Sequence, residues 1–430
     1  MSQGFERDRD DFARGARAIV VLPDHGGSKR DPEARLAETA GLAAAIGVVV
    51  ADLVHIRVRA PKPATLIGSG QTEELAIRVR MEDAQLVVFD AALTPVQQRN
   101  LETALDAKVI DRTGLILEIF GERAATAEGR LQVELAHLDY QGGRLVRSWT
   151  HLERQRGGFG FLGGPGETQI EADRRLIRDR MARLRRELDQ VTRTRGLHRE
   201  RRQRAPWPVI ALVGYTNAGK STLFNRLTGA DVMAENLLFA TLDPTLRQIG
   251  LPGIEKAILS DTVGFVSDLP TQLVAAFKAT LEEVVSADLL IHVRDIAHPD
   301  SEAQRLDVEA VLTELGVGES TPRFEAWNKF DLVAAHGRDD LLDQAERRDD
   351  VVAISALRGD GIDGLLDKVA VKLTASHRRY SIMVEDADGA GPAWLYAHGE
   401  VLEQRVEEGR TTYDVRLSPT DYERFNQRSF

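Results

Sequence analysis

The sequence of 430 residues contains no cysteine and no long uninterrupted apolar run. Without cysteine, disulfides, thiolate metal sites and thiol nucleophiles are excluded. The longest apolar stretches, such as the one at 41–52, are much shorter than the roughly 20 residues that a membrane span needs. The N-terminus lacks an apolar signal core, so we expect a cytoplasmic protein without a membrane span. Peripheral association with a membrane is left open.

Acidic residues outnumber basic ones in the whole chain, by 67 to 56, but basic charge is concentrated in one segment. The net charge is −11, yet residues 144–204 carry 17 arginines, no lysine and 8 acidic residues, a net charge of +9. A basic patch in an acidic protein is typical of a polyanion partner, because phosphate binding depends on the local field. The alternative is a solvated charged helix, although such a helix usually mixes its signs more evenly.

The pattern of short apolar strands and amphipathic helices predicts three α/β domains. In residues 1–205, strands at 18–23, 48–59, 86–90 and 108–111 alternate with helices at 32–46, 72–81 and 94–107. This order predicts a parallel sheet covered on both faces. Residues 206–375 alternate in the same way, with strands at 209–213, 257–261, 289–295, 324–328 and 351–355. Residues 376–430 predict a small third domain, with a helix at 400–408 and a strand at 413–417.

A helical hairpin is expected at the end of the first domain, over about 167–205. An a/d seam with spacings of 7, 4, 3, 4 and 3 runs through Ile170, Ile177, Met181, Leu184, Leu188 and Val191. We expect Gly196 to break this helix and a second basic helix to return, with the arginines facing away from the seam. Just before it, Gly157–Gly166 contains six glycines and two phenylalanines, a loop that either stacks on unpaired bases or acts as a hinge.

Residues 214–221 read Gly-Tyr-Thr-Asn-Ala-Gly-Lys-Ser, a complete phosphate loop between a predicted strand and a predicted helix. Backbone N–H groups and the helix dipole of such a loop hold the α- and β-phosphates. Lys220 would reach the β- and γ-phosphates, and Ser221 would ligate Mg²⁺. Asn217 resembles the asparagine that coordinates K⁺ in cation-activated GTPases, and its alternative role is a structural hydrogen bond within the loop.

Two further segments are candidates for switches that sense the γ-phosphate. The segment Asp261-Thr-Val-Gly264 ends a strand, where the carboxylate can hold a Mg²⁺-bound water and the Gly264 N–H can bond the γ-phosphate. Thr241 is the candidate for the second side-chain Mg²⁺ ligand, and Thr245 is the alternative. The catalytic candidates are Lys220, Thr241 and Gly264, and the metal ligands are Ser221 and Thr241.

Phe265 follows Gly264, where Ras-like GTPases place the glutamine that orients the attacking water. A phenyl ring cannot orient water. We therefore expect slow intrinsic hydrolysis and stimulation by a partner.

The segment Asn328-Lys-Phe-Asp331 predicts that the base is guanine. The Asp331 carboxylate can accept hydrogen bonds from guanine N1–H and N2–H₂, a donor pair that adenine lacks. After the last predicted strand, the Ala356 N–H can bond guanine O6. The predicted nucleotide site comprises Gly214, Tyr215, Thr216, Asn217, Ala218, Gly219, Lys220, Ser221, Thr222, Phe239, Ala240, Thr241, Asp261, Thr262, Val263, Gly264, Asn328, Lys329, Asp331, Ser355, Ala356 and Leu357.

These motifs, with the upstream segment 157–169 and its basic helix, resemble the HflX family of translational GTPases over nearly the whole chain. The resemblance implies an N-terminal α/β domain with a helical hairpin, a P-loop Ras-like GTPase domain with a mostly parallel sheet, and a small C-terminal α/β domain. It implies GTP as the substrate with Mg²⁺. It also implies binding to the large ribosomal subunit and its rRNA through the basic hairpin and the glycine-rich loop, and splitting of stalled 70S ribosomes under stress.

Two alternatives share these motifs. One is a large-subunit assembly GTPase, and the other is a GTP-dependent ribosome-binding switch without splitting activity. From Arg378 onward the chain has 7 basic and 10 acidic residues, which favours a protein partner for the third domain, such as a ribosomal protein. We expect a monomer. ATP binding by the first domain, attributed to some relatives, has no second phosphate loop to support it in residues 1–208.

Overall fold

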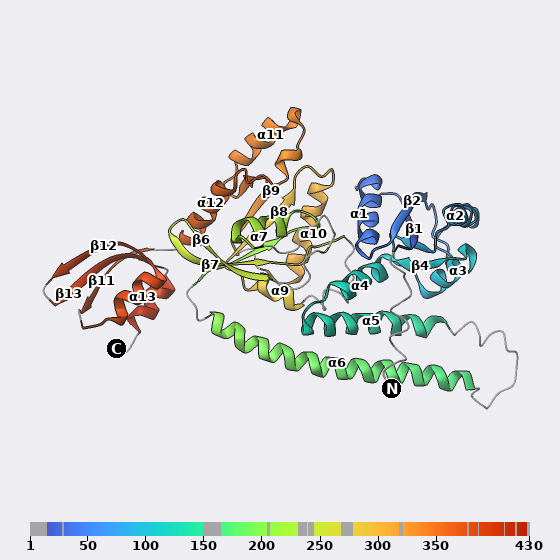
Figure 1. Cartoon of the computed structure of the whole chain (residues 1–430), viewed down its shortest axis with the longest axis horizontal. Coiled ribbons are helices and arrows are strands. Elements are labelled where there is room, and N and C mark those ends of the chain that lie inside the picture. The colour runs from blue at the N-terminus through green and yellow to red at the C-terminus, as the bar shows by residue number, and fades with distance from the viewer. Residues whose placement is uncertain are drawn as a thin grey trace.

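The computed structural model describes residues 15–27, 30–148, 165–203, 207–230, 239, 245–267, 278–317, 321–375, 378–385, 387–407, 409–417 and 419–427. They form an N-terminal, a central and a C-terminal unit, each built on one sheet. The long helix α6 (Pro165–Gln203) runs along one side of the first two units, and the third lies at the far end (Figure 1). In this described part, no helix is both long enough and apolar enough to cross a membrane.

The N-terminal unit has a parallel four-stranded sheet in the order β2-β1-β3-β4. Alternate residues of its central strand β1 face opposite sides, so Val20 packs under α1 and α4 and Val21 packs under α2 and α3. The strands are β1 (Arg17–Asp24), β2 (Val49–Arg57), β3 (Leu86–Phe89) and β4 (Lys108–Asp111). The helices are α1 (Pro32–Ala45), α2 (Ser69–Met81), α3 (Pro95–Leu105) and α4 (Arg112–Arg123). The parallel sheet predicted for this region is confirmed.

The helical hairpin differs from the predicted one. Helix α6 continues through Gly196 to Gln203, so the expected break was wrong, and the partner helix is α5 (Ala127–Ser148). A glycine inside a helix costs only about 1 kcal/mol, which the rest of a helix this long can offset. The seam itself packs on α5 through Ile177, Met181 and Leu184, which contact Leu131, Leu135 and Leu138. The glycine-rich loop lies outside the described residues up to 164, and its last two residues begin α6.

The central unit has a six-stranded sheet in the order β10-β9-β8-β5-β7-β6, and only β6 is antiparallel to its neighbour. The strand β6 was not predicted, because its mixed polar and apolar sequence at a sheet edge gives little periodic signal. The strands are β5 (Val209–Val213), β6 (Thr245–Leu251), β7 (Ile254–Asp261), β8 (Leu289–Asp295), β9 (Arg323–Asn328) and β10 (Val351–Ala353). The helices are α7 (Lys220–Thr228), α9 (Lys278–Val285), α10 (Ser301–Glu314), η1 (Phe330–Leu332), α11 (Ala335–Glu346) and α12 (Ile362–Thr374).

The C-terminal unit is an antiparallel sheet in the order β11-β13-β12, formed by β11 (Arg378–Glu385), β12 (Glu400–Glu407) and β13 (Arg410–Leu417). The helices α13 (Ala390–His398) and α14 (Pro419–Asn426) contribute Leu395 and Phe425 to the apolar cluster on one face. The predicted helix at 400–408 was wrong, because these residues form β12. Glutamate and glutamine favour a helix locally, but pairing with β13 overrides that preference.

Candidate nucleotide-binding site

The phosphate loop follows β5, a central strand of the six-stranded sheet, and leads into α7. The Lys220 ammonium donates to the carbonyl oxygens of Gly214 (3.1 Å) and Tyr215 (2.9 Å), so the loop encircles it. Burial lowers the pKa of Lys220 to about 8, against the opposing effect of Asp261, so the group stays largely charged at neutral pH. Because an ammonium has three donors, one N–H remains for a phosphate oxygen.

Two glycines of the loop are required by close packing as well as by backbone conformation. Gly214 has φ +151°, and a Cβ there would lie 2.2 Å from the Val293 carbonyl oxygen of β8. Gly219 has φ +95°, and a Cβ there would lie 2.1 Å from Nδ2 of Asn328. The loop therefore fits against both β8 and the predicted guanine motif, and a side chain at either position would push them apart.

Asn328, predicted as part of the guanine motif, connects two loops of the site. Its Nδ2 donates to the Ala218 carbonyl oxygen of the phosphate loop (2.8 Å), and its Oδ1 accepts from the Ala356 N–H (2.9 Å). The Asn328 side chain is buried at the end of β9. It thereby fixes the distance between the loop that surrounds the phosphates and the loop expected to contact guanine O6.

A hydroxyl and a carboxylate meet beside the phosphate loop. Ser221 Oγ donates to Asp261 Oδ2 at 2.7 Å, and Asp261 is fully buried at the end of β7. Hard oxygen donors of this kind are the ligands that Mg²⁺ prefers, directly or through water, so this pair fits the predicted ion. The other metal candidate, Thr241, lies outside the described residues together with Ala240. Thr245 begins β6 and pairs with Asp261 across the two strands.

The segment after β7 lies directly on the phosphate loop. The Phe265 N–H donates to the Gly214 carbonyl (3.1 Å), and the Thr216 N–H donates to the Phe265 carbonyl (2.7 Å). Gly264 precedes Phe265 and lies equally close to the loop. A Cβ on Gly264 would lie only 2.7 Å from Thr216 Cα and 3.1 Å from Lys220 Nζ. The Phe265 ring is buried in the apolar core, so it neither contacts nor orients solvent.

The guanine motif ends in a left-handed residue and a largely buried carboxylate. Lys329 has φ +58° and pairs through Nζ with Asp295 Oδ2 at 2.7 Å, at the end of β8. The Asp331 side chain is 7% exposed, and Nε of the exposed Arg358 approaches its Oδ2 to 3.6 Å. The carboxylate is thus held at the rim of the site. Asp295 and Arg358 were not predicted, since neither belongs to a recognised motif.

A third missed residue, Arg226 of α7, holds the loop that follows β10. Its Nε donates to the Ala356 carbonyl oxygen (2.7 Å), and its Nη2 donates to the Leu357 carbonyl oxygen (2.5 Å). Ser355 and Ala356 are buried, whereas the Leu357 side chain is 72% exposed. Arg226 therefore links the helix that carries the phosphate loop to the backbone that would contact the base.

Asn217 is exposed in the phosphate loop and has φ +58°. Its side chain makes no hydrogen bond to another described residue, so the structural hydrogen bond considered for it is not observed within the described ranges. Thr262, by contrast, has a structural role, because its hydroxyl donates to the Leu212 carbonyl oxygen (2.6 Å) and ties β7 to β5.

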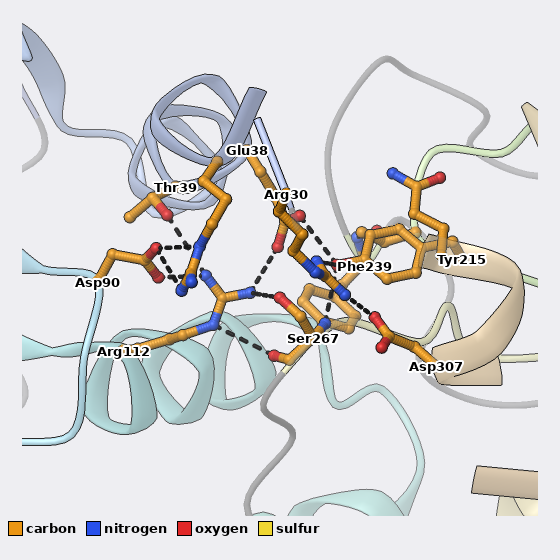
Figure 2. Close-up of polar contacts among 12 residues, drawn as sticks. Arg30, Glu38, Thr39, Asp90, Arg112, Tyr215, Phe239, Ser267 and Asp307 are labelled. Carbon is orange, nitrogen blue, oxygen red and sulfur yellow. Dashed lines mark hydrogen bonds and ion pairs between the residues drawn. The ribbon is translucent and has the colours of Figure 1, made fainter. Parts of the chain in front are cut away.

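Two predicted site residues contact the N-terminal unit (Figure 2). The Tyr215 hydroxyl donates to Glu38 Oε2 (2.9 Å) and accepts from the Ser267 N–H (2.8 Å). Burial and the Glu38 carboxylate raise the pKa of Tyr215, so the hydroxyl stays protonated and can donate. The Phe239 ring packs edge-on against Phe120 of α4, with ring centroids 4.8 Å apart. The site is therefore continuous with the boundary between the two units.

Four family models match consecutive parts of the chain. They are described as GTP-binding GTPase N-terminal (residues 33–121), GTP-binding GTPase Middle Region (123–202), 50S ribosome-binding GTPase (209–329) and HflX C-terminal domain (340–429).

Similar proteins cover almost the whole chain. GTPase HflX of Magnetococcus marinus is 50% identical over 404 residues, 94% of this chain and 93% of the relative. GTPase HflX of Escherichia coli K12 is 41% identical over 418 residues, 96% of each. Among solved structures, a GTP-binding protein from Sulfolobus solfataricus in complex with GDP aligns with a TM-score of 0.45 and 24% identity, covering 84% of this chain and 99% of that one. That likeness is too distant to carry a statement about function.

Proposed function

Because this chain belongs to the HflX family of GTPases, we propose that it associates with the large ribosomal subunit and splits stalled 70S ribosomes. The observation that carries the proposal is that one chain combines a guanine-nucleotide site in its central unit with a long, arginine-rich helix. Hydrolysis of GTP is the activity of the family. A switch of this kind acts through a segment whose conformation depends on the γ-phosphate.

For the nucleotide site, we propose roles that follow from the sequence motifs and, for Lys220, Ser221 and Gly264, also from their contacts. Lys220 would bind the β- and γ-phosphates, and Gly264 would present its N–H to the γ-phosphate. Ser221 and Thr241 would hold Mg²⁺, which neutralises charge on the phosphate oxygens. Asp331 would accept from the guanine N–H groups, while Asn217 would supply an oxygen to K⁺.

We propose that hydrolysis is slow until the ribosome is bound. The buried Phe265 supplies no polar group to the attacking water. A group from the partner would then have to orient that water or stabilise the charge of the transition state, which in other GTPases is worth about 10³–10⁵ in rate. We propose the ribosome as this partner, because the arginine-rich helix α6 can bind the phosphates of rRNA.

The candidate RNA-binding surface is the outward side of α6. Its 39 residues extend over about 58 Å. The seam residues face α5, which leaves the long arginine side chains on the solvent side, including Arg175, Arg178, Arg183, Arg185 and Arg186. Such a row of guanidinium groups can follow a phosphate backbone. The acidic C-terminal unit would instead contact a ribosomal protein.

Sucrose-gradient profiles test the proposal directly. Intact 70S ribosomes are incubated with the full chain and either GTP, a non-hydrolysable GTP analogue or GDP. We expect subunits to appear with GTP and, for one round, with the analogue, because binding drives splitting and hydrolysis serves release. Co-migration with intact ribosomes without splitting would favour a binding switch. Binding only to assembly intermediates would favour an assembly GTPase.

Replacing four exposed arginines of α6 by glutamine should weaken ribosome association. The set is Arg175, Arg178, Arg183 and Arg186. If each contacts one phosphate, the slope of log affinity against log salt should fall by about 3. Binding is measured by co-sedimentation at several salt concentrations. A matched control replaces four ion-paired arginines of the C-terminal sheet, which are Arg379, Arg405, Arg410 and Arg416. If the slope of log affinity against log salt were the same for both variants, α6 would be a solvated spacer that does not contact ribosomal phosphates.

A further inference from the structure

Ser267 lies three residues after Gly264, and each of its polar groups is bonded by one of two side chains (Figure 2). Its N–H donates to the Tyr215 hydroxyl (2.8 Å). Its carbonyl oxygen accepts from Arg112 Nε (3.2 Å), and its Oγ accepts from Arg112 Nη2 (2.9 Å). One residue of the switch segment is thus held both by the phosphate loop and by the N-terminal unit.

Arg112 is itself fixed within the N-terminal unit before it contacts the switch segment. It is the first residue of α4, is 4% exposed, and uses all five of its N–H donors. Three of them bond Asp90 Oδ1 (2.5 Å), Glu38 Oε1 (2.5 Å) and Thr39 Oγ1 (3.3 Å). Although burial alone would lower it, the Asp90 and Glu38 carboxylates raise the pKa of Arg112 above its usual value. The remaining two donors are directed at Ser267.

Glu38 connects the two side chains that hold Ser267. One carboxylate oxygen accepts from Arg112, and the other accepts from the Tyr215 hydroxyl at 2.9 Å. A buried ion pair of this kind is costly to break from one side, because the partner charge stays behind without water. Glu38 therefore links Arg112 and Tyr215 through its two carboxylate oxygens.

The same helix also contacts the other predicted switch segment. Phe120, two turns after Arg112 on α4, packs against Phe239, whose N–H donates to Thr216 Oγ1 of the phosphate loop (3.1 Å). One apolar cluster includes Phe120, Phe239 and Phe265 and crosses from one unit to the other. Helix α4 is thus in contact with both segments that border the γ-phosphate position.

We propose that Arg112 and Tyr215 are positioning residues for GTP binding, and that they hold the segment from Gly264 to Ser267 in the arrangement that receives the γ-phosphate. Three residues span at most about 10 Å, so fixing Ser267 restricts Gly264 strongly. A segment that is already ordered loses little further conformational entropy when the nucleotide binds. The Gly264 N–H would bond only the γ-phosphate, which GDP lacks, so holding this segment would raise the affinity for GTP relative to GDP. This inference concerns nucleotide binding alone and does not depend on ribosome splitting.

The variant Tyr215→Phe tests the proposal, because it removes one hydroxyl that points away from the phosphate loop. It leaves the buried Ser267 N–H without its acceptor. We expect the affinity of the full-length chain for a fluorescent, non-hydrolysable GTP analogue to fall about tenfold, with GDP affinity changed less than about twofold. Both affinities are measured by titration at the same Mg²⁺ concentration.

A matched control is Tyr140→Phe, which removes the hydroxyl of a half-buried tyrosine that donates to Asp111 (2.6 Å) within the N-terminal unit. It should leave the ratio of the two affinities unchanged. Arg112→Lys keeps the charge beside Asp90 and Glu38 but loses the fork to Ser267, and Ser267→Ala removes only Oγ. Both variants should lower the affinity for the GTP analogue relative to that for GDP. They test the proposal even if Tyr215→Phe fails to fold. Equal losses for both nucleotides, or an unchanged ratio in all three variants, would overturn the proposal.

Discussion

Replacing Asp331 by asparagine is expected to lower the affinity for GTP by at least about 10³-fold and to make xanthosine triphosphate the preferred nucleotide. The carboxylate would accept from two donors of guanine, whereas an asparagine amide offers one acceptor and one donor group. Xanthine carries a carbonyl oxygen in place of the guanine 2-amino group and can accept from that amide. The largely buried position of the Asp331 side chain makes an unmatched donor costly.

Competition titrations with guanosine and xanthosine triphosphates measure this change of preference. The matched control is Asp295→Asn, which removes a second carboxylate, the one that pairs with Lys329 of the same motif at 2.7 Å. That variant should lower the affinity for both nucleotides by the same factor, since Asp295 pairs with Lys329 and is not expected to contact the base. If Asp331→Asn kept its selectivity for guanosine, the base would have to be recognised elsewhere.

Replacing Gly264 by alanine is expected to lower the turnover number for GTP by about 10²-fold, because a shift of about 1 Å at the reacting centre costs that much. The new Cβ would lie 2.7 Å from Thr216 Cα and 3.1 Å from Lys220 Nζ, distances that backbone and ammonium cannot tolerate without moving. The segment must therefore lift from the phosphate loop. GDP affinity should change little, because the Gly264 N–H is expected to bond the γ-phosphate, which GDP lacks.

Phosphate release under single-turnover conditions measures the effect, with and without ribosomes. Gly364→Ala serves as the control, since it lies in α12 of the same unit and its Cβ would meet open space. That substitution should leave the rate unchanged, because alanine is favoured over glycine in a helix. A Gly264→Ala variant with normal turnover would show that the segment can move without loss.

Much of the fold was predictable because its elements carry strong local periodicity. The buried strands β1, β3, β4, β5 and β8 are short apolar runs, and the structure has them close to their expected bounds. Three of the failures have one cause. The edge strand β6, the strand β12 and the pairing of α6 with α5 all depend on distant partners. Local pattern cannot show which partner a segment will meet.

The candidate site likewise contains residues that motifs mark and residues that only the structure reveals. The structure brings the phosphate loop, the segment ending at Gly264 and the guanine motif together at the carboxyl ends of the central strands. It adds Arg226, Asp295 and Arg358, which no motif marks. Their role arises from positions that only the packed sheet and helices create.

By itself, the sequence determined which nucleotide is bound, because a phosphate loop and a guanine motif are each made by a few consecutive residues with defined backbone conformations. Only the tertiary structure decided what that site is connected to. Tyr215 bonds Ser267 and Glu38, which are 52 and 177 residues away along the chain. The contact with Glu38 depends on how two separately formed sheets pack against each other, because buried polar groups must find partners across the boundary.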